Sequence, residues 1–233
     1  MTEFAETLRH LSAAQKPAKG VSLYTLFVNR PAGRFLAAVA YRVGATPNQL
    51  TVLSALFTFP ALAAVALLPP GPGMAVCVGA ALAVGFALDS ADGQLARGQR
   101  SGSPSGEWLD HVLDCVKIVT LHLVVLVSLY RFFTLPSPLL LLAPMVFQLA
   151  AVVIFFAGIL TEKLKGRTPG TAPAGSAPAL RSVLLLPVDY GVTCVAFLFL
   201  GSQQAFLTVY GALLLAHVVF MGAFLVKWFR ELR

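Results

Sequence analysis

Residues 74–97 read MAVCVGAALAVGFALDSADGQLAR, and this stretch decides the fold of the chain. The run from 74 to 88 carries no charge, and two acids, Asp89 and Asp92, follow it one helical turn apart. A helix of about 20 apolar residues crosses the roughly 30 Å of hydrocarbon in a lipid bilayer. The stretch therefore predicts a membrane-spanning helix that ends in a pair of carboxylates at the membrane surface.

Composition extends this prediction to the whole chain. Of its 233 residues, 58% are hydrophobic and only 12% are charged, and the mean hydropathy is +0.81. A soluble domain of this length would carry about twice as much charge on its surface. The first 20 residues contain no apolar core of a signal peptide, so we expect no cleaved segment. We therefore expect an all-α integral membrane protein.

Similar apolar runs recur along the sequence and predict six membrane-spanning helices. We expect them at 48–68, 74–97, 106–132, 137–161, 182–200 and 204–227. Counted from Arg30 onwards, twelve basic residues fall just before the first helix, in the second and fourth loops and in the C-terminal tail, whereas only Arg131 falls on the other side. The positive-inside rule then predicts a multi-pass protein of the cell membrane with both termini in the cytoplasm. The net charge is +7, but the basic residues flank the spans, where they would face lipid headgroups. We therefore expect no nucleic-acid partner.

The chain before the first span predicts a short amphipathic helix in the membrane interface. Residues 31–43 place several apolar side chains on one helical face, namely Leu36, Val39, Ala40 and Val43. The sequence TPNQ at Thr46–Gln49 then predicts a capping box that starts the first span. We expect a cytoplasmic segment over 1–46 and one transmembrane domain over 47–233. Within that domain, the Pro-, Gly- and Ser-rich stretch 165–179 predicts a flexible cytoplasmic loop.

Four of the five aspartates in the chain lie between residues 89 and 114. Asp89 and Asp92 are spaced i,i+3, and Asp110 and Asp114 are spaced i,i+4, so each pair projects from one helical face. Loop 98–105 is short, which predicts antiparallel neighbouring helices whose carboxylates converge and face the cytoplasm. Such a cluster needs a cation, and oxygen ligands favour Mg²⁺ or Mn²⁺. Four carboxylates can hold two ions, an arrangement that clamps a phosphoryl group in transfer.

Small and basic residues surround the aspartates. Gly93, Ala96 and Gly106 leave room beside the carboxylates for a nucleotide or phosphate, and Arg97 can pair with a pyrophosphate. The alternative interpretation is a solvated charged loop, or a structural network of the aspartates with Arg97 and Arg100. The scarcity of acids elsewhere in the spans favours a ligand site.

This segment resembles the signature of the CDP-alcohol phosphotransferase family, whose members are also called CDP-alcohol phosphatidyltransferases. The family pattern is D-x-x-D-G-x-x-A-R, eight residues, then G-x-x-x-D-x-x-x-D, and every fixed position is filled here. The matching residues are Asp89, Asp92, Gly93, Ala96, Arg97, Gly106, Asp110 and Asp114. The expected number of spans also looks like the family, as does the TPN-x-x-T start formed by Thr46, Pro47, Asn48 and Thr51.

The resemblance implies an enzyme and a role for each matching residue. Asp89, Asp92 and Asp110 would be metal ligands, and Asp114 would complete the metal site and act as general base. The nucleotide would be bound by Gly93, Ala96, Arg97, Gly106 and Asn48. The reaction would move a phosphatidyl or phospho-alcohol group from a CDP-linked donor, such as CDP-diacylglycerol, to an alcohol acceptor, with release of CMP. Membrane lipids are further expected partners, and a homodimer is left open.

Three further residues are weaker candidates for binding the acceptor. Lys117 lies on the Asp110–Asp114 face, where it would either bind an acceptor phosphate or balance the carboxylates. His111 and Arg181 have equally good structural explanations, as a packing histidine and as a topology-anchoring arginine. Asp189 would pair with Lys117 or line a lipid entrance.

The sequence leaves three alternative functions. Glu107 and His111 give G-E-x-x-D-H, which looks more like enzymes that move a phospho-amino-alcohol of the choline or ethanolamine type onto a lipid hydroxyl. A membrane prenyltransferase would usually carry more spans and two separated acidic motifs. A small metal-cation transporter would place its acids at the bilayer midplane rather than at one end. The spacing of the aspartates favours the phosphotransferase.

Overall fold

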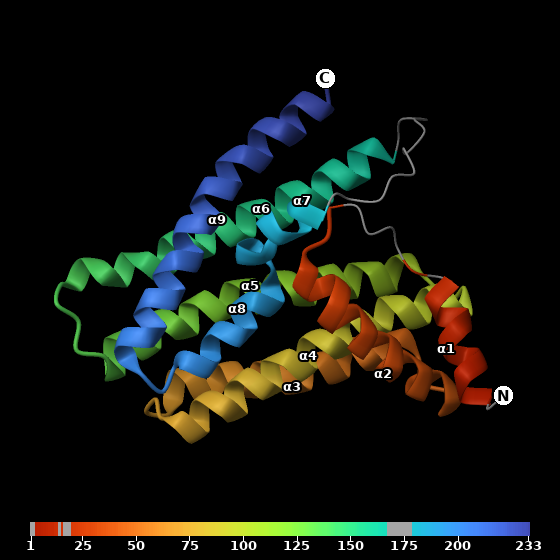
Figure 1. Cartoon of the computed structure of the whole chain (residues 1–233), viewed down its shortest axis with the longest axis horizontal. Helices are drawn as coiled ribbons and strands as arrows, with labels where there is room; N and C mark the ends of the chain where they lie inside the picture. Colours follow the sequence, from red (N-terminus) through yellow and green to blue (C-terminus); the bar gives the residue numbers. More distant parts are fainter. Residues whose placement is uncertain (1–2, 14, 16–19, 167–178) are drawn as a thin grey trace.

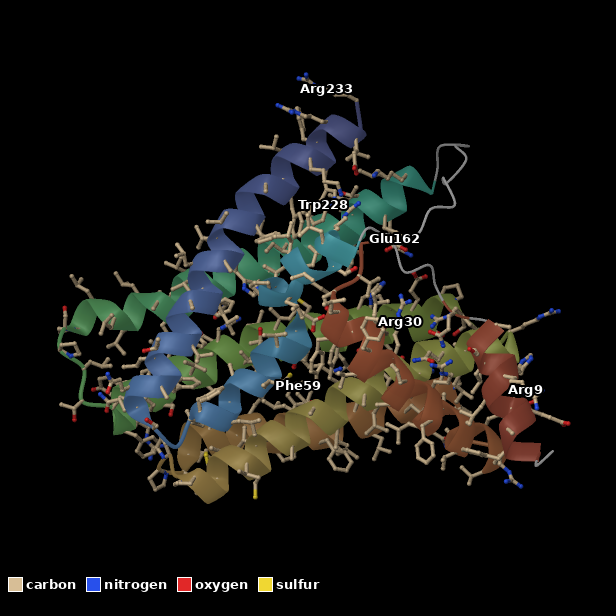
Figure 2. The ribbon with its side chains drawn as sticks, in the orientation of Figure 1. Arg9, Arg30, Phe59, Glu162, Trp228 and Arg233 are labelled. Carbon is tan, nitrogen blue, oxygen red and sulfur yellow. The ribbon has the colours of Figure 1, made fainter. Side chains whose placement is uncertain are left out.

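The computed structural model describes residues 3–13, 15, 20–166 and 179–233, and all regular structure in them is helical (Figure 1). The N-terminal part holds α1 (Glu3–Ala13), a π-helical turn (Thr25–Asn29) and α2 (Arg30–Arg42). Three long helices follow, which are α3 (Pro47–Leu67), α4 (Pro72–Gln99) and α5 (Pro104–Phe132). The second half holds α6 (Leu142–Lys165), α7 (Ala179–Leu184), α8 (Tyr190–Ala196) and α9 (Gln203–Glu231). Figure 2 shows the side chains that these helices carry.

Five helices of the described chain are long and apolar enough to cross a membrane. They are α3, α4, α5, α9 and the continuous run Pro138–Lys165, which joins a 3₁₀ turn (Pro138–Leu141) to α6. Each has between 21 and 29 residues, and about 20 residues suffice to span the hydrocarbon. The expected class, an all-α protein with membrane-spanning helices, is confirmed.

Side-chain caps fix where α3 and α5 begin. Gln49 N–H donates to Thr46 Oγ1 at 3.3 Å and Thr46 N–H donates to Gln49 Oε1 at 2.8 Å, so the predicted capping box is confirmed. Ser103 Oγ accepts from Gly106 N–H at 3.1 Å at the start of α5. Both helices have proline at their first position, where the missing N–H would have no intrahelical partner.

The expected fifth span, 182–200, is interrupted in the structure. It consists of α7, a 3₁₀ turn (Leu186–Val188), α8 and a second 3₁₀ turn (Phe197–Phe199). Pro187 has no N–H to donate, and Asp189 has an extended backbone with φ −81° and ψ 131°. The Asp189 carboxylate then caps α8 by accepting from Gly191 N–H at 2.7 Å. The prediction of one uninterrupted helix over 182–200 is therefore wrong.

Asp189 also ties α8 to the segment before α2. Its carboxylate accepts from the hydroxyl of Ser22 and from Thr25 Oγ1, the latter at 2.6 Å. We expect Asp189→Ala to destabilise the protein by about 1–2 kcal/mol, because the cap and both hydroxyl contacts are lost. That loss corresponds to a fall in Tm of roughly 2–8 °C in thermal unfolding in detergent. Asp189→Asn keeps a capping oxygen, so its Tm should fall less than that of Asp189→Ala. Equal Tm values for wild type and Asp189→Ala would contradict this role.

α2 occupies the position of the expected N-terminal helix and packs on α4 through small residues. A Cβ built on Gly33 would lie 2.8 Å from Ser90 Cβ, so this close approach needs glycine. Only part of the expected apolar face of this helix is buried. Ala40 is buried, whereas Val39 and Val43 are exposed. Small side chains take the packed face because they let the two backbones approach.

The larger buried core lies at the end of the bundle away from the aspartates. Its bulky members include Leu62, Leu82, Phe147, Phe197 and Phe206. A smaller cluster joins α1 and α2 to α3 and α4 through Leu11, Ala37, Leu50 and Leu95. This second cluster also includes Leu88 and Ala91, so it packs the same part of α4 that carries Asp89 and Asp92.

Candidate active site

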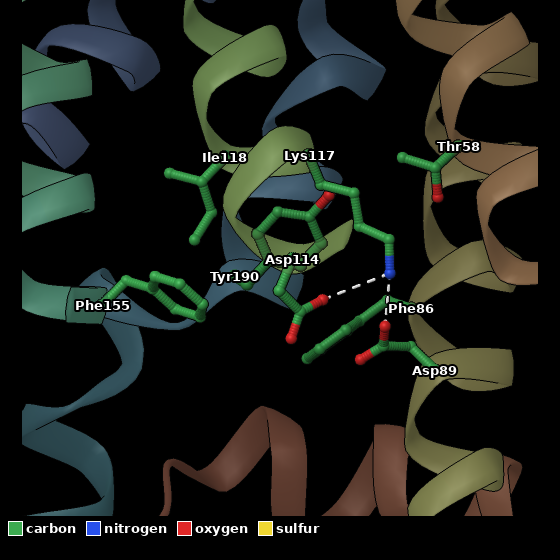
Figure 3. A pocket seen from close by; sticks show the side chains of 8 residues that line it. All are labelled: Thr58, Phe86, Asp89, Asp114, Lys117, Ile118, Phe155 and Tyr190. Carbon is green, nitrogen blue, oxygen red and sulfur yellow. Dashed lines mark hydrogen bonds and ion pairs between the residues drawn. The ribbon is translucent and has the colours of Figure 1, made fainter. Parts of the chain in front are cut away.

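The four aspartates come from the last turns of α4 and the first turns of α5. α3 packs closely against both helices, whereas the backbones of α4 and α5 approach each other far less. Side chains such as Asp89, Asp114 and Lys117 occupy the space between them (Figure 3). The expected convergence of carboxylates is present, and α3 is the element that holds the two helices at the right separation.

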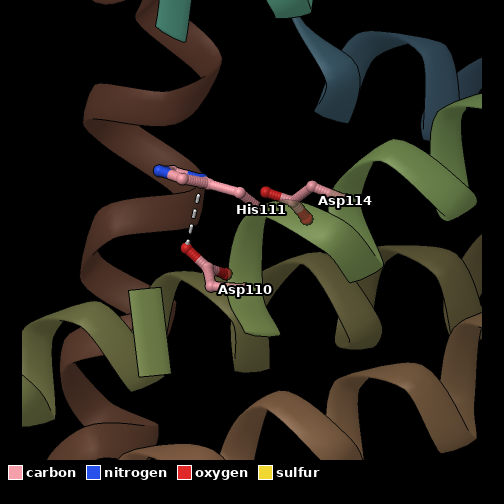
Figure 4. Close-up of side chains that lie close together, drawn as sticks. All are labelled: Asp110, His111 and Asp114. Carbon is pink, nitrogen blue, oxygen red and sulfur yellow. Dashed lines mark ion pairs between the residues drawn. The ribbon is translucent and has the colours of Figure 1, made fainter. Parts of the chain in front are cut away.

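The carboxylates form two overlapping groups of ligand atoms. Asp89, Asp92 and Asp110 each offer an oxygen within 4.8 Å of the others, and Asp110, His111 and Asp114 form a second group within the same limit. Asp110 belongs to both groups, and Figure 4 shows it beside His111 and Asp114. Sets dominated by carboxylate oxygens suit Mg²⁺ or Mn²⁺. The residues present therefore fit the predicted metal.

Asp92 is held by a residue of α3. It is 5% exposed, and its Oδ2 accepts from Thr51 Oγ1 at 2.6 Å. The same hydroxyl lies 3.1 Å from the carbonyl of Pro47, one turn earlier in α3. Thr51 thus fixes the orientation of one predicted metal ligand. This gives a structural reason for the second threonine in the TPN-x-x-T start.

Lys117 is buried among the aspartates and has an acceptor for each of its three N–H groups. Its Nζ contacts an Asp89 oxygen and lies 3.2 Å from Asp114 Oδ1 (Figure 3). It also donates to Ser54 Oγ at 3.1 Å. Its side chain is only 4% exposed. These contacts favour the charge-balancing alternative over the binding of an acceptor phosphate. Asp189 does not pair with Lys117, because its own partners are Ser22, Thr25 and Gly191.

A cavity of about 610 Å³ opens beside Asp92 and Asp110. Its lining includes all five residues expected to bind the nucleotide, namely Asn48, Gly93, Ala96, Arg97 and Gly106. A Cβ on Gly106 would lie 2.9 Å from Asn48 Oδ1, and one on Gly93 would lie 3.2 Å from Arg97 Nη1. Both glycines therefore leave this space open for a ligand and for the movement of these polar side chains.

A small cavity of about 140 Å³ lies on the other side of the aspartates. It is lined by Asp89, Asp114 and Lys117, and by the aromatic rings of Phe86 and Tyr190 (Figure 3). The same two rings also line a third, larger cavity of about 870 Å³, whose wall contains Arg181. Arg181 is therefore separated from the carboxylates by Phe86 and Tyr190.

His111 and Glu107 lie on the first turns of α5. His111 Nε2 is 3.8 Å from a Glu107 oxygen, and His111 Nδ1 is 3.9 Å from Asp110 Oδ2. Glu107 also forms an exposed ion pair with Lys163 at the end of α6. His111 thus belongs to the second ligand group, while Glu107 joins α5 to α6.

Sequence reasoning missed three groups that the structure places in the site. Ser54 binds Lys117, and Phe86 and Tyr190 stand between the aspartates and the cavity of Arg181. Phe86 lies one turn before Asp89, so helical spacing offered a signal for it. Nothing local in the sequence points to Ser54 or Tyr190, because both come from other elements.

Comparisons with known proteins find a matching family and a solved structure with a similar fold. The family model for CDP-alcohol phosphatidyltransferases matches residues 44–226. A solved structure with the same fold is the Mycobacterium tuberculosis phosphatidylinositol phosphate synthase (PgsA1), crystallised with CDP-DAG bound. It is 21% identical with a TM-score of 0.55, and the match covers 86% of this chain and 93% of that one. No curated protein sequence matches the chain significantly. Since the family model spans all four aspartates and the helices that hold them, this chain belongs to the CDP-alcohol phosphatidyltransferase family.

Proposed function

We propose that this protein transfers a phosphatidyl group from CDP-diacylglycerol to the hydroxyl of an alcohol, with release of CMP. One observation carries the proposal: two of the four aspartates line the cavity that also contains Gly93, Arg97 and Gly106. Carboxylates that can hold a metal therefore face a space suited to a nucleotide. The PgsA1 structure, which contains CDP-DAG, supports the choice of donor.

The metal ligands in this proposal are Asp89, Asp92 and Asp110, with Asp114 and His111 beside a second position. The cation is Mg²⁺ or Mn²⁺, and the ligand groups provide for up to two ions. When bound, it neutralises the charge of the pyrophosphate and of the departing CMP. Thr51 keeps Asp92 oriented towards the site through its 2.6 Å hydrogen bond.

The remaining groups bind substrate and move a proton. Arg97 pairs with the donor phosphates, and Asn48 with the open glycines binds the nucleotide. Asp114 takes the proton from the acceptor hydroxyl. At the same time, the oxygen of that hydroxyl forms a bond to the donor phosphorus distal to cytidine. The bond between that phosphorus and the bridging oxygen breaks, and CMP leaves with the electron pair.

The acceptor is proposed to enter from the side of Arg181. That side chain lines the cavity of about 870 Å³, and Phe86 and Tyr190 form a wall that this cavity shares with the one at Asp114. Arg181 then binds an anionic group of the acceptor, and His111 is retained as a weaker candidate. Glu107 has a structural role through Lys163, so the G-E-x-x-D-H sequence does not require an amino-alcohol donor.

The placement in the membrane is also a proposal. The interrupted segment 182–200 acts as the sixth crossing, since a Cβ on Gly201 would lie 2.8 Å from Pro72 N at the far end of α4. α2 lies in the interface with Val39 and Val43 towards lipid. Both termini and the aspartates lie on the cytoplasmic side of the cell membrane. The division into segments 1–46 and 47–233 and the formation of a homodimer remain predictions, and the loop within 165–179 lies largely outside the described residues.

Release of CMP tests the proposed function. Purified protein is given CDP-diacylglycerol, Mg²⁺ or Mn²⁺, and a panel of acceptors comprising inositol phosphate, glycerol phosphate and serine. We expect CMP release with at least one acceptor and its loss when the metal is chelated. A second arm supplies CDP-choline or CDP-ethanolamine with diacylglycerol; activity only in that arm would establish the amino-alcohol alternative. No metal-dependent CMP in either arm would contradict the enzyme.

A further inference from the structure

Two buried histidines lie inside the bundle, away from the aspartates, and the proposed function gives neither of them a role. His122 belongs to α5 and His217 to α9. His122 follows Asp114 by eight residues, which is about 12 Å along the helix at about 1.5 Å per residue. Ionisable side chains within membrane-spanning helices are costly, and by default they indicate a functional site.

Both histidines line a cavity of about 200 Å³ between α5, α6, α8 and α9. One water molecule takes up roughly 30 Å³ in the liquid, so the cavity has room for a group of several atoms. Its other polar lining residues are Tyr190 and Thr193, and the described part of its lining contains no charged side chain. Tyr190 also lines the cavity at Asp114 and the larger one that contains Arg181. The new cavity therefore adjoins the proposed active site.

The neighbours of the two rings determine which nitrogens carry protons. His217 Nδ1 lies 2.9 Å from the carbonyl of Leu213, and a carbonyl only accepts, so this Nδ1 carries the proton. His122 Nδ1 lies 2.7 Å from the buried phenol of Tyr210 and is the one acceptor that the described residues offer to its O–H. The proton of His122 therefore lies on Nε2. Uncharged surroundings stabilise the neutral form of both rings.

Packing keeps the two rings in place. The ring of Phe147 lies 4.2 Å from that of His122 and 4.5 Å from that of His217, measured between centroids. Phe147 is fully buried, and it also packs on Tyr210 at 4.9 Å. Rings fixed in this way lose little freedom when a ligand binds. Each then has its Nε2 left for a partner in the cavity.

An N–H donor on one ring and a lone-pair acceptor on the other match a hydroxyl group. We propose that this cavity binds an uncharged hydroxyl, which accepts from His122 Nε2–H and donates to His217 Nε2. Thr193 Oγ1 lies 3.4 Å from the carbonyl of Asp189, to which it donates, so its lone pairs add a second acceptor. A phosphate would find no cation in the described lining, and an ammonium would find no carboxylate.

Two kinds of molecule could supply this hydroxyl. One is a polyol acceptor that reacts at Asp114 through one hydroxyl and places another in the cavity; that case rests on the proposed function. The other is a membrane lipid with a free hydroxyl, such as a diacylglycerol. Both are bound by the same chemistry, and the experiment below distinguishes them.

The test is nuclear magnetic resonance of the purified full-length protein in detergent with ¹⁵N-labelled histidine, whose ring signals report protonation and hydrogen bonding. We expect a proton on Nε2 of His122 and on Nδ1 of His217. Glycerol and myo-inositol probe for a polyol, and dioleoylglycerol probes for a lipid hydroxyl. At least one of them should shift both Nε2 signals. His10, an exposed histidine of α1, is the internal control and should not respond.

Variants measure how much the histidine contributes. His217→Phe keeps an aromatic ring but loses the acceptor, so affinity for the active probe should fall about tenfold, the effect of one hydrogen bond of about 1.4 kcal/mol. His217→Gln keeps an acceptor oxygen and a donor for Leu213, and it should resemble wild type. Ser128→Ala is the matched control, because it removes a buried hydroxyl of α5 outside this cavity.

The outcomes separate this inference from the proposed function, because no donor or metal is present. A shift with glycerol or myo-inositol supports a polyol, and a shift with dioleoylglycerol supports a lipid. Trioleoylglycerol, which lacks the hydroxyl, should have no effect. No shift with any probe, an equal shift with trioleoylglycerol, or unchanged affinity in His217→Phe would overturn the hydroxyl site while leaving CMP release as evidence for the enzyme. A shift without any CMP release would overturn the proposed function alone.

Discussion

Asp114→Asn should abolish turnover while leaving nucleotide binding largely intact. The amide cannot take the proton of the acceptor hydroxyl, and positioned general bases contribute about 10²- to 10⁴-fold to rates. We therefore expect CMP release to fall by that factor. Affinity for CMP in the presence of Mn²⁺, measured by calorimetry, should change little, because Asp114 is not among the residues that line the nucleotide cavity. The loss should thus appear in kcat rather than in nucleotide affinity.

The control for this experiment is Glu6→Gln, which removes an exposed carboxylate of α1 away from the site. It should keep wild-type turnover. Full turnover in Asp114→Asn would show that another group accepts the proton. A large loss of nucleotide binding in the same variant would instead show that Asp114 acts mainly as a metal ligand.

Asp89→Asn should lose metal-dependent nucleotide binding as well as turnover. Asp89 belongs to the first ligand group and also contacts Lys117, so its charge supports both the metal and the placement of the ammonium. Changing a residue one shell outside a metal site typically costs about 10- to 100-fold in metal affinity, and a direct ligand should cost at least about tenfold. Calorimetric titration first with Mn²⁺ and then with CMP measures the binding of the metal and the binding of the nucleotide separately.

The comparison of the two variants separates their roles. Asp89→Asn and Asp114→Asn remove the same charge from opposite sides of Lys117, so they serve as controls for each other. Equal nucleotide affinity in both would contradict the assignment of Asp89 to the metal. Weak binding in Asp89→Asn alone, together with loss of turnover in both, is the expected pattern.

Much of the fold follows from features that are local in the sequence. Apolar runs of about 20 residues set the membrane-spanning helices, and the capping box at Thr46 with Gln49 set the start of α3. The interruption near Asp189 was missed because hydropathy averages over a window. Pro187 and the cap at Asp189 break the helix without making the segment less apolar. The presence of proline was a visible signal, but it also occurs inside α3 at Pro60 without ending that helix.

The membrane class and the set of four aspartates follow from the order of residues alone, because i,i+3 and i,i+4 spacings place each pair on one face whatever surrounds it. What those aspartates contact depends instead on the packing of helices that are distant in the sequence. Lys117 reaches Ser54 across 63 residues and Asp89 across 28, and Thr51 reaches Asp92 across 41. These contacts depend on how α3 packs against both α4 and α5, which no local pattern encodes. The lysine that could have bound substrate is, for that reason, a cation held within the carboxylate cluster.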